Sequence, residues 1–283
     1  MGKGKNNEEL FRSMPVAQAI LTLAVPTVVS QIITIIYNMA DTFFIGQLGD
    51  PKQVAAATLA MPLFMFMTAL SNLFGVGGAS LISRFLGRGE REKASRCGAF
   101  CIWTAAAVSV LYGLMVLAGR PVLLPVLGAN EETCDMASSY LFWTIGLGAL
   151  PTVMNPVLAH LIRSEGYSRQ ASLGVAFGGI LNMVLDPLFI YGLHLQITGA
   201  AVATLISNAT AMIYFLAFIW KMRGVSVLTL SPEMYTLGEH IPAEVISVGM
   251  PSFLISMMGT VSNMVLNHII AGYSNVAVAG MGI

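Results

Sequence analysis

The chain has 283 residues, of which 56% are hydrophobic and only 10% are charged, and its mean hydropathy is +0.76. A water-soluble domain carries about 25% charged residues, so this composition excludes an ordinary globular protein and indicates a membrane protein. Fourteen Lys and Arg residues balance fourteen Asp and Glu residues, and we therefore expect a lipid bilayer, not a nucleic acid, as the surrounding partner.

Seven apolar segments follow one another along the chain, each long enough to cross a hydrocarbon core of about 30 Å as a helix. They span residues 16–47, 54–83, 97–118, 136–160, 171–193, 198–220 and 243–271. The predicted fold class is therefore an all-α polytopic membrane protein. Cys97 and Cys101 share a helix face, but no histidine or acid joins them, so we predict packing thiols, no metal site and no cofactor.

The positive charges lie mostly on one side of the predicted membrane. When Lys and Arg are assigned alternately to the two sides, twelve fall on one side and only Lys52 and Arg120 on the other. Positive residues favour the cytoplasm, so we predict a cytoplasmic N-terminus in the plasma or inner membrane. The segment 87–96, GRGEREKASR, is predicted to be a cytoplasmic loop because its two glutamates dilute the basic charge.

The seventh segment resembles the first. Pro251 aligns with Pro26 and Asn263 with Asn38, and residues 276–283 then align with 54–61. We therefore expect a repeat, with two six-helix lobes of parallel orientation and a substrate cavity between them; a coincidental match is the alternative. The expected parts are a cytoplasmic N-terminus (1–15), a six-helix lobe (16–221), a cytoplasmic linker (222–242) and a truncated second lobe (243–283).

Two acids lie at hydrocarbon depth, Asp41 in the first segment and Asp186 in the fifth. A lone charge there costs several kcal/mol, so it normally faces a cavity or a partner. Each acid lies six residues from the outer end of its segment, which places both about 9 Å below the outer surface. The matched depth predicts one shared site.

Uncharged hydrogen-bonding residues accompany both acids. Ser30, Thr34, Asn38 and Asp41 recur at steps of four, four and three on one helix face, with Tyr37 adjacent. The other segments contribute Asn155, Asn182, Thr204 and Asn208. This set predicts a cavity that holds water and protons, although each residue alone is also explained by interhelical adhesion worth about 0.6 kcal/mol.

Two prolines lie within helical segments beside this site. Pro187 has no N–H, so it leaves the carbonyl of Met183 unpaired and bends the helix beside Asp186, and Pro26 has the same effect in the first segment. We interpret both as candidate hinges, while simple structural kinks are the alternative.

Four stretches resemble the multidrug and toxic compound extrusion (MATE) family, most closely its DinF-like branch. They are PTVVSQIITIIYNMADTFFIGQLG (26–49), LISRFLGRGEREKA (81–94), HLIRSEGYSRQA (160–171) and LNMVLDPLFI (181–190). The resemblance implies a twelve-helix antiporter of two six-helix lobes, exporting small amphiphilic organic cations in exchange for protons or sodium. Five helices of the second lobe are missing from this sequence, so we expect a truncated protein that needs a C-terminal lobe.

The resemblance also assigns roles to residues. It implies ion coupling by Asp41, Asp186, Asn182 and Thr204, cavity positions at Tyr37 and Asn155, and a bending point at Pro26. We expect Asp186 to take up a proton from outside and release it inside, which weakens the bound cation and permits bending. Segment 249–271 has no acid, which argues against the coupling chemistry of the NorM-like branch without excluding sodium.

Other functions stay open at this point. A lipid-linked precursor flippase would need a basic residue deep in its cavity, and none lies near the middle of the first six segments. A channel or receptor, or a non-transporting fragment, is a further alternative. We do not expect an enzyme, because no segment pairs an acid with a nucleophile or a metal-ligand set.

Overall fold

The computed structural model describes residues 15–129, 133–238 and 240–271, and every regular element in these ranges is a helix. Six helices are long and apolar enough to cross a membrane, or seven if one bent pair counts as a single span. This agrees with the predicted all-α polytopic fold. The N-terminal residues 1–14 and the predicted start of a second repeat at 276–283 lie outside the described residues.

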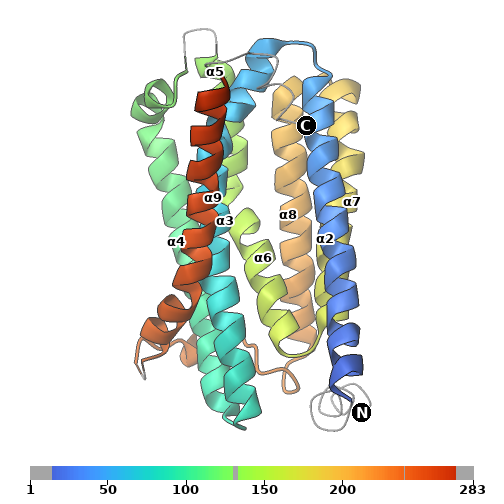
Figure 1. Cartoon of the computed structure of the whole chain (residues 1–283), viewed down its shortest axis with the longest axis vertical. Helices are drawn as coiled ribbons and strands as arrows, with labels where there is room; N and C mark the ends of the chain where they lie inside the picture. Colours follow the sequence, from blue (N-terminus) through green and yellow to red (C-terminus); the bar gives the residue numbers. More distant parts are fainter. Residues whose placement is uncertain (1–14, 130–132, 239, 272–283) are drawn as a thin grey trace.

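The helices of Figure 1 correspond closely to the predicted segments. In chain order they are α2 (Val16–Gly46), α3 (Pro51–Gly87), α4 (Arg91–Val126), α5 (Cys134–Leu141), the π-helix η1 (Phe142–Leu147), α6 (Ala149–Ser164), α7 (Ser168–Pro187), the π-helix η2 (Leu188–Gly192), α8 (Gln196–Lys221), the 3-10 turn η3 (Pro232–Met234) and α9 (Ile241–Ala271).

The fourth predicted span is not one straight helix. Cys134–Leu147 and Ala149–Ser164 meet at Gly148 with a bend of 45°. A side chain at Gly148 would overlap the carbonyl of Thr144, and Pro151 supplies no N–H to the carbonyl four residues before it. The predicted span 136–160 therefore corresponds to a bent pair of helices, because glycine and proline break the hydrogen-bond ladder at this point.

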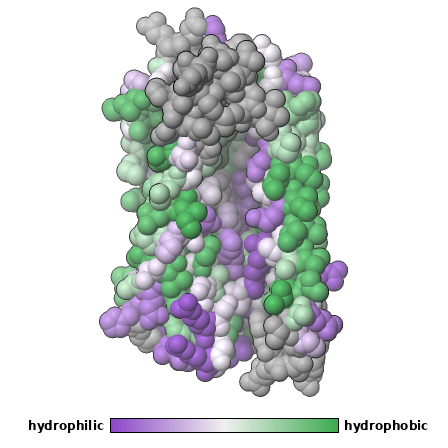
Figure 2. All heavy atoms as spheres, in the orientation of Figure 1, coloured by the Kyte–Doolittle hydropathy of each residue, from purple (hydrophilic) through white to green (hydrophobic). Residues whose placement is uncertain are grey.

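Helix α6 occupies the centre of the bundle. It contacts α3 and α4 on one side and α7 and α8 on the other, while α9 packs on α3 and α2 packs on α7. In Figure 1 the two groups, α3, α4 and α9 on the left and α2, α7 and α8 on the right, lie on either side of α6. Figure 2 shows that the surface between the groups is hollowed and carries hydrophilic side chains in an otherwise apolar wall.

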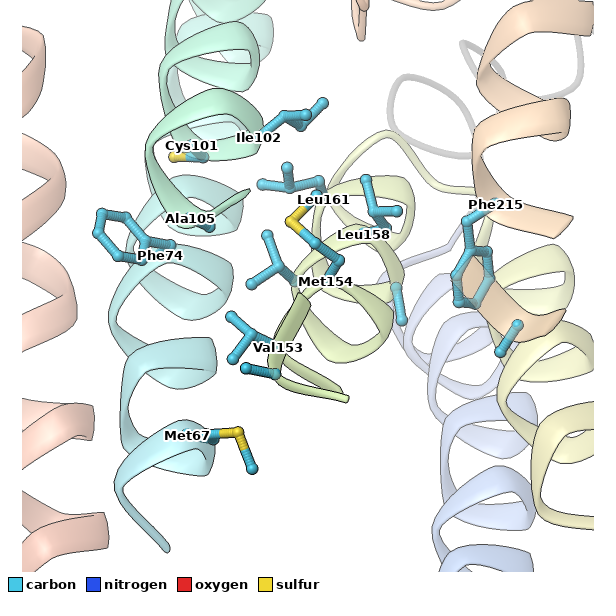
Figure 3. Close-up of a cluster of buried hydrophobic side chains, with 14 of the residues drawn as sticks. Met67, Phe74, Cys101, Ile102, Ala105, Val153, Met154, Leu158, Leu161 and Phe215 are labelled. Carbon is cyan, nitrogen blue, oxygen red and sulfur yellow. The ribbon is translucent and has the colours of Figure 1, made fainter. Parts of the chain in front are cut away.

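The apolar core surrounds the buried face of α6. Figure 3 shows Val153, Met154, Leu158 and Leu161 of α6 between Phe74 and Cys101 on one side and Phe215 on the other. Small residues permit this packing: a Cβ at Gly78 would lie 2.5 Å from the sulfur of Cys101. Lipid is as apolar as these side chains, so close packing, not exclusion of water, holds such helices together.

The segment between α8 and α9 is attached to the C-terminal end of α6 through one carboxylate. Oε1 of Glu165 accepts hydrogen bonds from the hydroxyl of Ser226 at 2.8 Å, from Val227 N at 3.1 Å and from Leu228 N at 2.8 Å. Arg91 of α4 donates to the carbonyl of Val225 at 2.8 Å. The predicted linker 222–242 is therefore bound to the lobe at its beginning.

Candidate functional site

Asp186 lies near the C-terminal end of α7 and is fully buried, with 0% of its surface exposed. Asn182, one helical turn earlier, donates from Nδ2 to Asp186 Oδ1 at 3.2 Å, and the same nitrogen lies 3.4 Å from Thr204 Oγ1 of α8. The i, i+4 spacing places Asn182 and Asp186 on one face of α7. The other carboxylate oxygen, Oδ2, is buried and has no hydrogen-bond partner among the described residues.

Asp41 of α2 approaches the same place from the neighbouring helix. Its Oδ1 is buried without a hydrogen-bond partner among the described residues, and its charge interacts with that of Asp186. Helix α2 comes close to α7 because Gly179 has no side chain: a Cβ there would lie 2.8 Å from the ring of Tyr37. The structure thus brings the two predicted acids into one lobe interior.

A small cavity of about 30 Å³ lies beside this pair. It is lined by Tyr37, Asn155, Val175, Gly178, Gly179, Asn182, Thr204, Ser207 and Asn208. Its volume is sufficient for a water molecule, which needs at least 10–15 Å³ and two to four polar partners. Oxygen atoms of Asn155, Asn182 and Ser207 are buried there without partners among the described residues, so the cavity offers the acceptors that water or a small cation requires.

A second polar group joins α6 to α8 on the far side of this cavity. Asn155 donates from Nδ2 to Asn208 Oδ1 at 2.8 Å, and Asn208 Nδ2 lies 3.4 Å from Thr152 Oγ1. Five of the predicted cavity and coupling residues therefore line one space: Tyr37, Asn155, Asn182, Thr204 and Asn208.

Asn38 does not belong to this group. Between residues 30 and 41 of α2, the half-buried or buried positions are 30, 33, 34, 37, 40 and 41, whereas Asn38 is exposed. Each residue turns about 100° around the helix axis, so position 38 lies about 60° from position 41, at the edge of this stripe. Asn38 does not line the small cavity, and its expected place in a cavity between two lobes stays a prediction.

Two residues near the acids were not predicted from the sequence. Tyr140 of α5 is 7% exposed and interacts electrostatically with both Asp41 and Asp186. Ser207 of α8 is 4% exposed and lines the cavity. Tyr140 lies four residues after the start of the fourth predicted span, 136–160, and a hydroxyl inside an apolar segment was the available signal.

The prolines flank the site differently. Pro187 is the last residue of α7, and the chain continues directly as the π-helix η2. Tyr191 of η2 donates from its hydroxyl to the carbonyl of Phe44 at 2.9 Å, which attaches the C-terminal end of α2 to this turn. Pro26 lies inside α2, which is assigned as one unbroken helix across it.

The comparisons with known proteins agree on one family. A family model described as MatE matches residues 26–188. Multidrug export protein MepA of Staphylococcus saprophyticus is 33% identical over 273 residues, which are 96% of this chain and 60% of that protein. The chain therefore spans about 60% of the length of this relative.

Two solved structures show the same arrangement of helices. A MATE protein in the straight conformation has a TM-score of 0.87 and 29% identity, and the match covers 96% of this chain and 60% of that one. A MATE protein in the bent conformation has a TM-score of 0.82 and 28% identity, covering 95% of this chain and 58% of that one.

Proposed function

Because the chain belongs to the MatE family, we propose that it forms the N-terminal six-helix lobe and the following helix of a multidrug exporter. The expected substrates are small amphiphilic organic cations. We expect the N-terminus to lie in the cytoplasm and the chain to cross the plasma or inner membrane. The name of its staphylococcal relative, a multidrug export protein, supports export as the direction of transport.

One observation carries the proposal: two carboxylates, Asp41 and Asp186, share one lobe interior at hydrocarbon depth. Two like charges in a site of low polarity disfavour double ionisation, so the pair readily holds one proton. A cation competes with that proton, because each stabilises the same negative charge. This competition is what an antiporter requires: the two species occupy the site alternately.

The surrounding residues suit a small cation without holding it permanently. Asn182 and Thr204 connect Asp186 to the neighbouring helix, and the cavity lining is otherwise neutral. Protonation from outside removes negative charge and releases the organic cation, and deprotonation towards the cytoplasm restores the cation site. Sodium could replace the proton in this scheme, since carboxylate, amide and hydroxyl oxygens also bind a hard cation.

Bending of α2 at Pro26 is the proposed conformational step. Pro26 leaves the carbonyl of Thr22 without a backbone donor, which makes this turn the weakest point of the helix. Related MATE structures in straight and bent conformations support a change of this kind. We expect transport to need a second six-helix lobe, because a cavity between two lobes must open alternately to each side.

The test is efflux of a fluorescent lipophilic cation, ethidium, from proteoliposomes. The protein tested joins residues 1–283 to the part of the S. saprophyticus relative that follows the matched region, and residues 1–283 alone are assayed beside it. We expect Asp41→Asn and Asp186→Asn each to lower efflux driven by a pH gradient at least tenfold. Folded yield should stay unchanged, since removing a buried charge does not destabilise a membrane helix.

The matched control is Asp50→Asn at the first residue before α3. Asp50 accepts from Lys52 N at 3.0 Å, and asparagine caps a helix as well as aspartate does, so its efflux should equal that of the parent. Near-parental efflux by both site variants would refute the coupling proposal. Efflux driven only by a sodium gradient would keep the site and change its ion, and efflux by residues 1–283 alone would refute the need for a second lobe.

A further inference from the structure

Helix α2 has few contacts that hold it against the other helices. It packs on α7 and has only small contacts with α3 and α8. Much of its surface is exposed apolar side chain, including Val28, Val29, Ile32 and Ile36. In a bilayer, replacing the lipid contacts of these side chains by protein contacts gains little free energy. The polar contacts of α2 therefore have a larger part in fixing where it lies.

The innermost of these contacts centres on Ser30, which is 1% exposed. Its hydroxyl lies 2.8 Å from the carbonyl of Thr27 in its own helix, 3.3 Å from the hydroxyl of Ser172 in α7 and 3.4 Å from Nη2 of Arg163 in α6. A serine hydroxyl has one proton and two lone pairs. When the Ser30 hydroxyl donates its proton to the carbonyl of Thr27, its oxygen can accept a hydrogen bond from Arg163. One residue of α2 therefore contacts both α6 and α7.

Ser30 lies one helical turn beyond Pro26. It is thus the first point fixed to the lobe on the outer side of the proposed bend. Tyr37 and Asp41 follow at about 10 Å and 16 Å farther along the axis. Any movement of α2 at Ser30 therefore moves Asp41 relative to Asp186, which belongs to α7 itself.

The guanidinium group of Arg163 has few partners in this environment. No carboxylate forms an ion pair with it in the described parts of the chain, and its Nε is buried without a partner there. A simpler explanation is that it complements the C-terminal dipole of α6, in whose last turn it lies. That role needs only a positive charge, which lysine also supplies, whereas reaching Ser30 needs the long planar guanidinium.

We propose that Arg163 is a positioning residue which, with Ser172, anchors α2 at Ser30 and so sets the distance between Asp41 and the rest of the site. This rests on the proposed function in one respect: bending at Pro26 requires the anchor to release. The anchor is a contact between three helices and lies apart from the two acids that exchange the proton.

The test measures the position of α2 directly, in residues 1–283 in lipid nanodiscs. Nitroxide labels replace Ile36 of α2 and Val184 of α7, both exposed, and Cys134, the partly exposed cysteine, becomes Ser. Pulsed electron paramagnetic resonance then gives the distribution of distances between the labels. Ser30→Ala, Arg163→Gln and Arg163→Lys should each lower the ratio of anchored to released α2 about fivefold, the effect of one lost hydrogen bond.

The controls separate an anchor from other roles. Arg169→Gln changes an exposed arginine at the same end of the lobe and should leave the distribution as in the parent. Ser30→Ala combined with Arg163→Gln should add little to either change alone, because both remove the same contact. Ser30→Ala and Ser172→Ala are small changes that keep the chain folded if an Arg163 variant does not fold.

Two results would overturn the proposal. An unchanged distribution in both Ser30→Ala and Arg163→Gln would show that the contact does not hold α2. If Arg163→Lys keeps the parental distribution while Arg163→Gln changes it, the positive charge acts on the dipole of α6 and not on Ser30. Because the readout is a distance and not transport, it is independent of whether Asp41→Asn and Asp186→Asn abolish efflux.

Discussion

Helices α2 and α9 have the same length of 31 residues and a proline at matching places, Pro26 and Pro251, but they are attached to the lobe in different ways. Helix α9 lies backbone to backbone against α3. A Cβ at Gly77 would lie 2.5 Å from the carbonyl oxygen of Val245, and one at Gly249 would overlap the carbonyl of Leu73. Such a crossing leaves no room for either helix to slide.

Helix α2 has no comparable crossing with α7 in the described residues. Its closest approach is the ring of Tyr37 over Gly179, and its polar contacts are those of Ser30 and of the Phe44 carbonyl. Side chains can exchange partners with a change of rotamer, whereas a backbone contact cannot. The comparison teaches that α9 is held by backbone contacts with α3, whereas α2 is held by side-chain contacts that a change of rotamer can release.

The largest expected effect comes from the glycine crossing. Gly249→Ala places a methyl group against the backbone of Leu73, and we expect a loss of about 3 kcal/mol in stability, the upper part of the range for overpacking. Thermal melting in detergent measures it. The matched control is Gly259→Ala in the same helix, where a Cβ meets nothing within 4 Å; this variant should melt no lower than the parent. Equal melting of both variants would show that α9 is not fixed by this contact.

A smaller effect is expected at the linker that leads into α9. Glu165→Ala removes the acceptor of three hydrogen bonds and should cost about 2 kcal/mol of stability. If the linker does not help to hold α9, this variant will melt like the parent.

Glu165 also predicts a dependence on pH. Burial raises the pKa of its carboxyl above the ordinary 4.5, and the hydrogen bonds from Ser226, Leu228 and Val227 oppose this only in part. The folded state thus holds the proton more tightly than the unfolded state. Its contribution to stability is complete below pH 4.5 and is lost as the pH rises through the raised pKa.

Glu165→Gln should flatten this pH dependence, because glutamine keeps an acceptor oxygen but does not titrate. The measurement is the melting temperature from pH 4 to pH 8. The control Glu233→Gln, at an exposed position of the same linker, should keep the parental slope. A slope that persists in Glu165→Gln would assign the titration to another group.

The smallest effect is expected at the C-terminal end of α2. Tyr191→Phe removes only the hydroxyl that donates to the carbonyl of Phe44, which should cost about 1 kcal/mol. Hydrogen exchange of residues 44–48 should become faster, while the exchange of α9 stays as in the parent. Tyr235→Phe, which changes an exposed tyrosine of the linker, is the matched control.

Some parts of the site followed from the sequence because helical geometry is local. Asn182 and Asp186 lie four residues apart, so they share a face in any helix, and the structure joins them at 3.2 Å. The matched depth of Asp41 and Asp186 followed from counting residues at about 1.5 Å each. Which of Tyr37 and Asn38 lines the small cavity depends on how α2 is rotated about its axis, and only packing against α7 decides that rotation.

The sequence by itself determined what a bilayer demands of any chain: apolar segments of sufficient length, charges placed by the positive-inside rule, and two acids that must face the interior. Only the tertiary structure decided which helices are neighbours. The cavity lined by α2, α6, α7 and α8, the approach of Tyr140 to both acids and the contact of Arg163 with Ser30 join residues far apart in the sequence; Ser30 and Arg163 are 133 positions apart. Periodicity reports one helix at a time, whereas these contacts depend on how glycines let particular helix pairs come close, and that is a property of the assembled bundle.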